Sequence, residues 1–80
     1  MQTKFSEPAV LNWDSVIHKG VRTADGEPLG YIAADDEEAI LVLSSRFKEY
    51  RVPKKHVRSF DGSLVLLDIG IGEVNVYRIC

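Results

Sequence analysis

Cysteine is nearly absent from this 80-residue chain: the one cysteine, Cys80, is the last residue. A single thiol excludes an intrachain disulfide and a cysteine-cluster metal site, and it fits a reducing compartment. No apolar run approaches the roughly 20 residues that cross a bilayer, and the first residues lack the apolar stretch of a signal peptide. We therefore expect a cytoplasmic protein with no membrane contact.

Motifs that carry chemistry are also missing. His18 and His56 form no His-x-x-x-His pair and have no cysteine beside them, so nothing indicates a zinc site. The glycines form no Gly-x-Gly-x-x-Gly loop, and no Gly-Lys-Ser/Thr sequence occurs. Four serines lie in turn-like contexts without a nucleophile signature: Ser44, Ser45, Ser59 and Ser63. We expect no enzyme, no metal and no cofactor.

What the chain does have is a set of short apolar runs separated by turns. Asp25-Gly26 and Asp61-Gly62 each lie between strand-like runs, and this dipeptide is a strong signal for a tight β-connection. Gly30 indicates a bulge or a close backbone approach. The expected strands are 21–23, 29–34, 39–44, 47–52, 64–69 and 73–79, with 39–44 the most buried and 73–79 at an edge.

Two short helical turns are expected beside the strands. One spans residues 13–17, with Asp14 or Ser15 as its N-cap, and closes one end of the fold. The other begins at Pro53 and leaves Lys54, Lys55 and His56 pointing outward. Residues 1–12 form an N-terminal arm, and 13–80 form a single domain. With no long amphipathic helix to cover sheet edges, an all-β barrel of five to six strands is the expected fold.

Several of these turns and strands also match known motifs. They are Lys19-Gly20-Val21, Asp25-Gly26-x-x-Leu29-Gly30-Tyr31-Ile32, an acidic turn before Ile40-Leu41-Val42, Val52-Pro53-Lys54, and Asp61-Gly62-x-Leu64-Val65-Leu66. Over residues 16–69 the chain resembles the PRC-barrel domain family, which implies a small SH3-like barrel. The family includes a domain of the photosynthetic reaction-centre H subunit, ribosome maturation factors and short stand-alone prokaryotic proteins.

The resemblance implies binding and no catalysis, because its motifs carry no catalytic residues to transfer. This chain lacks the membrane helix of the reaction-centre subunit, so a photosynthetic role is not expected.

Charge is distributed unevenly along the chain, although its net value is only −2. Residues 46–58 hold six cations and one anion, Glu49, whereas 35–38 are four consecutive carboxylates. We expect two electrostatic poles in the folded molecule. The acidic run lacks the ligand spacing of a calcium loop, so a solvated turn is favoured there.

The basic segment is the main candidate binding site. Its candidate residues for a protein partner or RNA are Arg46, Lys48, Arg51, Lys54, Lys55, His56 and Arg58. Cations with interleaved aromatic rings suit phosphates and unpaired bases, but a solvated face or a protein contact is favoured at a pI near 5.6. Trp13, Phe5 and Phe60 are candidate aromatic anchors.

The expected function is that of a non-enzymatic protein-docking or adaptor module, with a homodimer as one of its forms. An edge strand at 73–79, two charge poles and a small core all favour burial against a second surface. The alternative is an RNA-binding or ribosome-assembly factor that uses the 46–58 surface. Neither the partner nor the biological process follows from the sequence.

Overall fold

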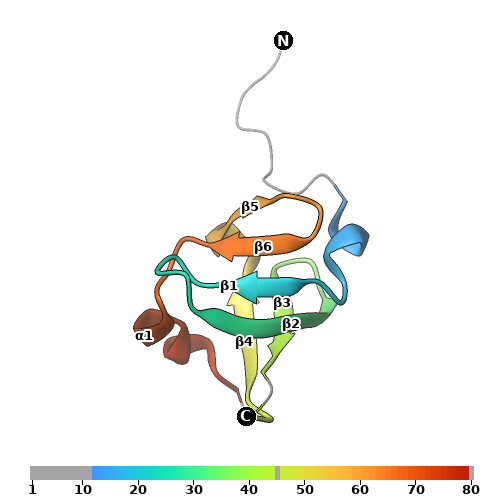
Figure 1. Ribbon diagram of the computed structural model, residues 1–80. Helices are drawn as coiled ribbons and strands as arrows, with labels where there is room; N and C mark the ends of the chain where they lie inside the picture. Colours follow the sequence, from blue (N-terminus) through green and yellow to red (C-terminus); the bar gives the residue numbers. More distant parts are fainter. Residues whose placement is uncertain (1–11, 45, 80) are drawn as a thin grey trace.

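The computed structural model describes residues 12–44 and 46–79, which form six strands and four short helical segments (Figure 1). The strands are β1 (Gly20–Arg22), β2 (Pro28–Asp35), β3 (Ala39–Leu43), β4 (Glu49–Pro53), β5 (Val57–Phe60) and β6 (Leu64–Leu67). The helical segments are the 3-10 turns η1 (Trp13–Val16), η2 (Lys54–His56) and η3 (Asn75–Tyr77), and the α-helical turn α1 (Ile71–Val74). None of these segments is a helix that could span a membrane.

All six strands belong to one sheet, in the order β4-β3-β2-β1-β6-β5. Neighbouring strands are antiparallel, except that β1 and β6 run parallel. The two edge strands, β4 and β5, are consecutive in the chain and are joined by η2 alone. The sheet therefore bends so that the end of β4 and the start of β5 lie close together at η2. The expectation of a mostly β domain is confirmed; within the described pairing β4 and β5 do not hydrogen bond, and the sheet is not closed.

The core lies on the inner face of this bent sheet. It follows from alternation along the strands, since every second residue of a strand faces the same side. Val16 of η1 and Val74 of α1 add fully buried side chains from outside the sheet. The strand residues of the core are Val21, Leu29, Ile32, Ile40, Val42, Tyr50, Val52, Val57, Val65 and Leu67. Burying one such aliphatic side chain contributes roughly 1.5–3 kcal/mol.

The turn predictions hold where glycine is needed. Gly26 and Gly62 have φ of 83° and 99°, as the two Asp-Gly turns require. In the second turn the Asp61 carboxylate accepts hydrogen bonds from the Ser63 and Leu64 amides. These bonds hold the pKa of Asp61 below the ordinary 3.8, and the Ser63 amide has the larger effect. Gly30, with φ 153°, lies so close to the Leu43 carbonyl that a Cβ could not fit. The predicted close backbone approach is confirmed.

The N-terminal helical turn is confirmed, but its predicted cap is wrong. Asn12 is the N-cap, and its side-chain oxygen accepts from the Asp14 amide at 3.0 Å. Asp14 and Ser15 lie inside η1, and Ser15 instead donates its hydroxyl to the Asn12 carbonyl. Val16 is fully buried, so this turn covers part of the core as expected. Of the expected N-terminal arm, residues 1–11 lie outside the described part, as does Cys80.

Two strand predictions are wrong. Residues 73–79 are not an edge strand: α1 and η3 occupy this region, and Arg78 pairs with Tyr50 in an isolated bridge and not in a ladder. The Glu73 carboxylate accepts from the Gly70 amide and so caps α1. Conversely, β5 forms where a turn was expected, because Val57, Ser59 and Phe60 find partners on β6. The β4 strand begins at Glu49, so Phe47 belongs to the preceding turn.

Candidate functional site

The predicted basic segment runs from the turn after β3, along β4, through η2 and into β5. It is therefore spread over several elements. Three of its seven candidates contact aspartate carboxylates: Arg51 and Lys54 in salt bridges, and His56 through a ring nitrogen. The other four have no salt bridge to any described residue and are Arg46, Lys48, Lys55 and Arg58. The structure thus divides the candidates into an internally paired group and a group left for solvent or a partner.

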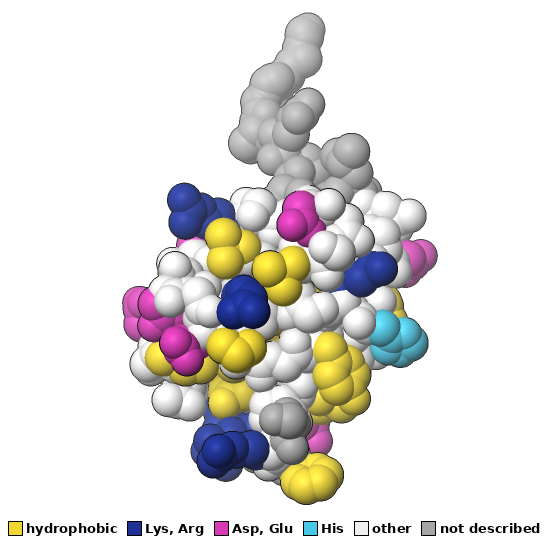
Figure 2. All heavy atoms as spheres, viewed as in Figure 1, with side chains coloured by type: hydrophobic (Ala, Val, Ile, Leu, Met, Phe, Trp, Pro, Cys, Tyr) yellow, Lys and Arg dark blue, Asp and Glu magenta, His cyan; other side chains and the backbone are white. Residues whose placement is uncertain are grey.

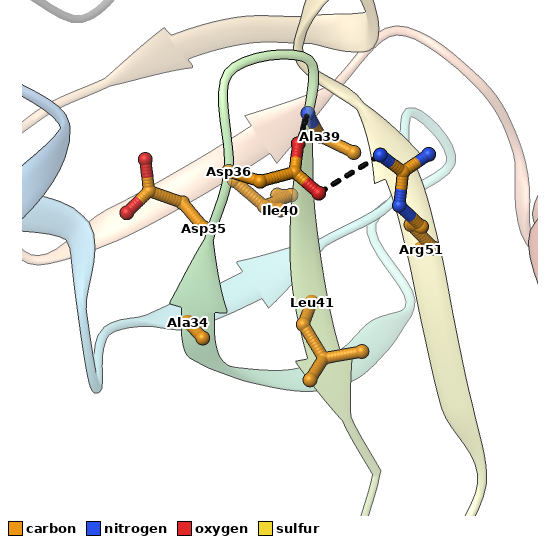
Figure 3. A pocket seen from close by; sticks show the side chains of 7 residues that line it. All are labelled: Ala34, Asp35, Asp36, Ala39, Ile40, Leu41 and Arg51. Carbon is orange, nitrogen blue, oxygen red and sulfur yellow. Dashed lines mark hydrogen bonds and ion pairs between the residues drawn. The ribbon is translucent and has the colours of Figure 1, made fainter.

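Arg51 is paired with the acidic turn. In Figure 3 the Asp36 carboxylate points toward Arg51 on β4 and toward the backbone of Ala39. The Arg51 guanidinium donates to Asp36 at 2.8 Å, and the amides of Glu38 and Ala39 donate to the same side chain. The Glu38 amide and then Arg51 hold the pKa of Asp36 below its usual range. Asp36 therefore holds the β2–β3 turn in place, and Arg51, a predicted binding residue, already has a partner within the molecule.

Lys54 is paired on the other side of the same turn. Figure 3 shows Asp35 directed away from Arg51, and its carboxylate accepts from the Lys54 ammonium at 2.9 Å. Both side chains are largely buried, with exposed fractions of 16% and 21%. The ammonium also lies 4.5 Å from the ring centroid of Trp13, a cation–π contact. The expectation that Lys54 points outward is wrong, and the two expected charge poles meet at this turn.

His56 is also held internally. Its Nδ1 lies 2.8 Å from an Asp68 carboxylate oxygen, and its Nε2 lies 3.0 Å from the Tyr77 hydroxyl. Only 20% of the side chain is exposed, so the expected outward orientation is wrong here too. The Tyr77 contact ties η2 to η3 and helps to hold the C-terminal segment against the sheet. Lys55 alone of the η2 residues is exposed as predicted.

A different surface stands out on the outer side of β2, β3 and β4. Strand register places Leu43 between Tyr31 and Glu49 in one row. The next row holds Leu41 between Ala34 and Arg51. We call the face made by these two rows and by Phe47, Ala39 and Pro53 the outer face. Its centre is apolar, although it points away from the core.

Three shallow hollows lie along the outer face. The first, about 250 Å³, is lined by the seven residues drawn in Figure 3, and the small side chains of Ala34 and Ala39 leave room in it. The second, about 330 Å³, is bordered by Tyr31, Leu43 and Phe47, together with Ser44 and Glu49. The third is lined by Glu38, Arg51, Pro53 and Lys55. Each is open and shallow, a form that suits a side chain of a partner better than an enclosed ligand.

Phe47 is the most exposed large apolar side chain described, at 91%. It has φ 66°, a left-handed conformation that is unfavourable for an aromatic residue. The turn holds it there: the Phe47 amide donates to the Ser44 carbonyl, and the Ser44 hydroxyl accepts from the amides of Arg46 and Lys48. Figure 2 shows Lys/Arg and apolar side chains together at the end of the molecule where Figure 1 places this turn. Strained residues of this kind gather at functional sites.

The other sequence candidates contribute little to this surface. Trp13 and Phe60 are partly buried against the core, so they are packing residues and not exposed anchors. Phe5 lies outside the described residues. In the described part of the chain, no group of three or more His, Asp or Glu residues is placed to hold a metal ion.

Sequence reasoning missed the outer face because 39–44 reads as one continuous apolar run. Leu41 and Leu43 alternate with Ile40 and Val42, and only the latter two are fully buried. The register between β2 and β3 is the information that reveals it. Leu41 pairs with Ala34 and Leu43 pairs with Tyr31, which places large and small outward residues in adjacent rows.

Comparison of the chain with protein-family models, with curated proteins and with solved structures finds no significant match in any of the three.

Proposed function

We propose that this protein is a non-enzymatic, cytoplasmic docking module that binds another protein through the outer face. The observation that carries the proposal is Phe47, an aromatic side chain held exposed by a strained turn beside Tyr31 and Leu43. Aromatic residues next to apolar hollows are typical hot spots of protein interfaces. An exposed apolar surface of this kind on a small domain is most economically explained by a partner that covers it.

We further propose that the domain is a PRC-barrel-like, SH3-like barrel. The support is its strand connection: the edges β4 and β5 are joined by the short turn η2, and β1 pairs in parallel with β6 to bring the two halves of the chain together. Amide-to-amide nuclear Overhauser contacts between β4 and β5 would establish the closure. Fast hydrogen exchange of the outward amides of both β4 and β5, as expected for strands without a partner on that side, would refute it.

RNA binding is the second candidate, and one observation favours it. Phe47 lies between Arg46 and Lys48 in the sequence, and neither cation forms a salt bridge with a described residue. An exposed ring flanked by such cations can stack a base and bind phosphates. Against it, Arg51, Lys54 and His56 are already bound to aspartates. We therefore rank protein docking first.

Site-specific photo-crosslinking tests both candidates. A benzophenone amino acid replaces Phe47 in the full chain, in cells of the source organism, and the matched control carries it at Val76, which is also exposed, at 80%. Docking predicts discrete protein adducts from position 47 that position 76 does not give, because only position 47 lies on the outer face.

Each outcome decides between the candidates. Adducts that contain nucleotides would replace docking by RNA binding. The same pattern of adducts at positions 47 and 76 would show that the outer face has no special role, and it would refute the docking proposal.

A further inference from the structure

We propose that the outer face binds a second copy of this chain, with the two β3 strands antiparallel about a two-fold axis at the level of Val42. This inference rests on the proposed docking function and names its partner. Because a two-fold interface brings one patch against itself, every contact it makes occurs twice. The outer face has the complementarity that such an arrangement needs, in shape and in charge.

The shape complementarity lies in the two central rows. Rotation about the axis places the row of Tyr31, Leu43 and Glu49 over the row of Ala34, Leu41 and Arg51 in the second copy. The large Tyr31 then faces the small Ala34, and Leu43 packs on Leu41. On β4, Glu49 faces Arg51, so opposite charges meet where the apolar contact ends.

Phe47 continues the same pattern beyond the central rows. Successive residues of a strand are about 3.4 Å apart, so rows on one face are about 7 Å apart. Phe47, in the turn before β4, borders the same hollow as Leu43 and Glu49. At the other end, Ala39 and Pro53 form the row beyond Leu41 and Arg51. The rotation therefore sets the exposed Phe47 ring into the hollow beside Ala39 of the second copy.

The charges at the two ends of β3 are complementary as well. One end carries Glu37 and Glu38, both exposed, and the other carries Arg46 and Lys48. The antiparallel arrangement brings the acidic end of each copy to the basic end of the other. Parallel strands would instead bring like ends together, so the charges select the antiparallel form.

Charge reversal provides a sharp test on the full chain. In the acidic-end variant, Glu37 and Glu38 become Lys; in the basic-end variant, Arg46 and Lys48 become Glu. Each variant places like charges together at both ends of the dimer, so we expect the Kd of self-association to rise about tenfold or more. A one-to-one mixture of the two restores both attractive contacts and should form a heterodimer as tight as the wild-type homodimer.

Sedimentation velocity from low micromolar to several hundred micromolar protein, at low and physiological salt, measures self-association of the wild type, of each variant and of the mixture. Recovery in the mixture also shows that both variants are folded. Arg22→Glu with Arg58→Glu is the matched control: it reverses two exposed cations on β1 and β5, outside the outer face, and should leave self-association unchanged.

The outcomes separate this inference from the docking proposal. A wild-type protein that is monomeric at several hundred micromolar overturns the dimer, and adducts from position 47 with a different protein would then still support docking. A dimer that forms without preference for the mixed pair would use another face, and it would also overturn the inference. Dimerisation of the wild type with recovery only in the mixture supports it.

Discussion

The two ends of β3 use their charged side chains in opposite ways. At its start, Asp35 and Asp36 pair with Lys54 and Arg51, so the charges hold the β2–β3 turn against β4 and η2. At its end, Arg46 and Lys48 form no salt bridge in the described part of the chain, and they flank the exposed Phe47. One run of basic residues is thus divided by the sheet into a structural part and a part that is available to a partner.

The largest expected effect on stability comes from adding a methyl group at Gly30, where β2 lies against the end of β3. A Cβ at Gly30 would overlap the Leu43 carbonyl, and φ is 153° there. We expect Gly30→Ala to lower the free energy of unfolding by about 3 kcal/mol or more, measured by urea unfolding. Gly72→Ala is the control, since nothing lies near that position, and it should not lower stability. Equal effects of the two substitutions would contradict the steric account.

At the start of β3, removing the Lys54 charge should have an intermediate effect. Lys54→Met keeps the aliphatic stem but leaves the mostly buried Asp35 carboxylate without its partner and removes the contact with Trp13. We expect a loss of about 1–2 kcal/mol, between the values for exposed and buried pairs. Lys55→Met, on the exposed neighbour, should change stability by less than about 0.5 kcal/mol. If both variants unfold at the same urea concentration, the Lys54–Asp35 pair does not stabilise the fold.

At the end of β3, relieving the strain at Phe47 should stabilise the fold. Asparagine tolerates the left-handed conformation better than phenylalanine, so Phe47→Asn should raise the free energy of unfolding by about 0.5–1 kcal/mol. The same variant should lose docking, because the anchor ring is gone. Arg46→Asn, which leaves the backbone strain in place, is the control for stability in thermal unfolding. A destabilised Phe47→Asn would mean that the ring serves the fold and not a partner.

The smallest expected effect is a change in acid stability at the start of β3. Hydrogen bonds from Glu38 and Arg51 hold the folded pKa of Asp36 below 3.8. Asp36 therefore contributes its stabilisation fully above that pH, and the contribution is lost as pH falls through the lower folded pKa. Unfolding between pH 2 and 7 should show a shallower acid loss in Asp36→Asn. Arg51→Met, which removes the Arg51 contribution and leaves the hydrogen bonds from the amides, should give an intermediate slope. An unchanged slope in both variants would contradict this account.

Local sequence signals predicted the parts of the fold that depend on local conformation. The Asp-Gly turns and Gly30 were predicted because a positive φ or a missing Cβ is a property of one residue. The error at 73–79 has the opposite origin. Val74 and Val76 suggest a strand, but the segment meets β4 in an isolated bridge at Arg78 and not in a ladder, and a capped helical turn buries Val74.

The candidate site was only partly predictable. Sequence reasoning identified the basic segment, yet it could not show that Lys54 and Arg51 lie opposite the acidic turn, because those pairs join residues 15 to 19 positions apart. The outward positions of Leu41 and Leu43 were hidden in an apolar run. Phe47 was assigned to a strand because its left-handed turn depends on the Ser44 hydrogen bonds.

The sequence by itself determined a mostly β domain with tight turns, because alternation and glycine placement act over a few residues. Only the tertiary structure decided which charges are paired and which face is left apolar and open. The physical reason is register: the pairing of β2, β3 and β4 sets Asp36 against Arg51 and aligns Tyr31, Leu41 and Leu43 on one side, and no single strand contains that information.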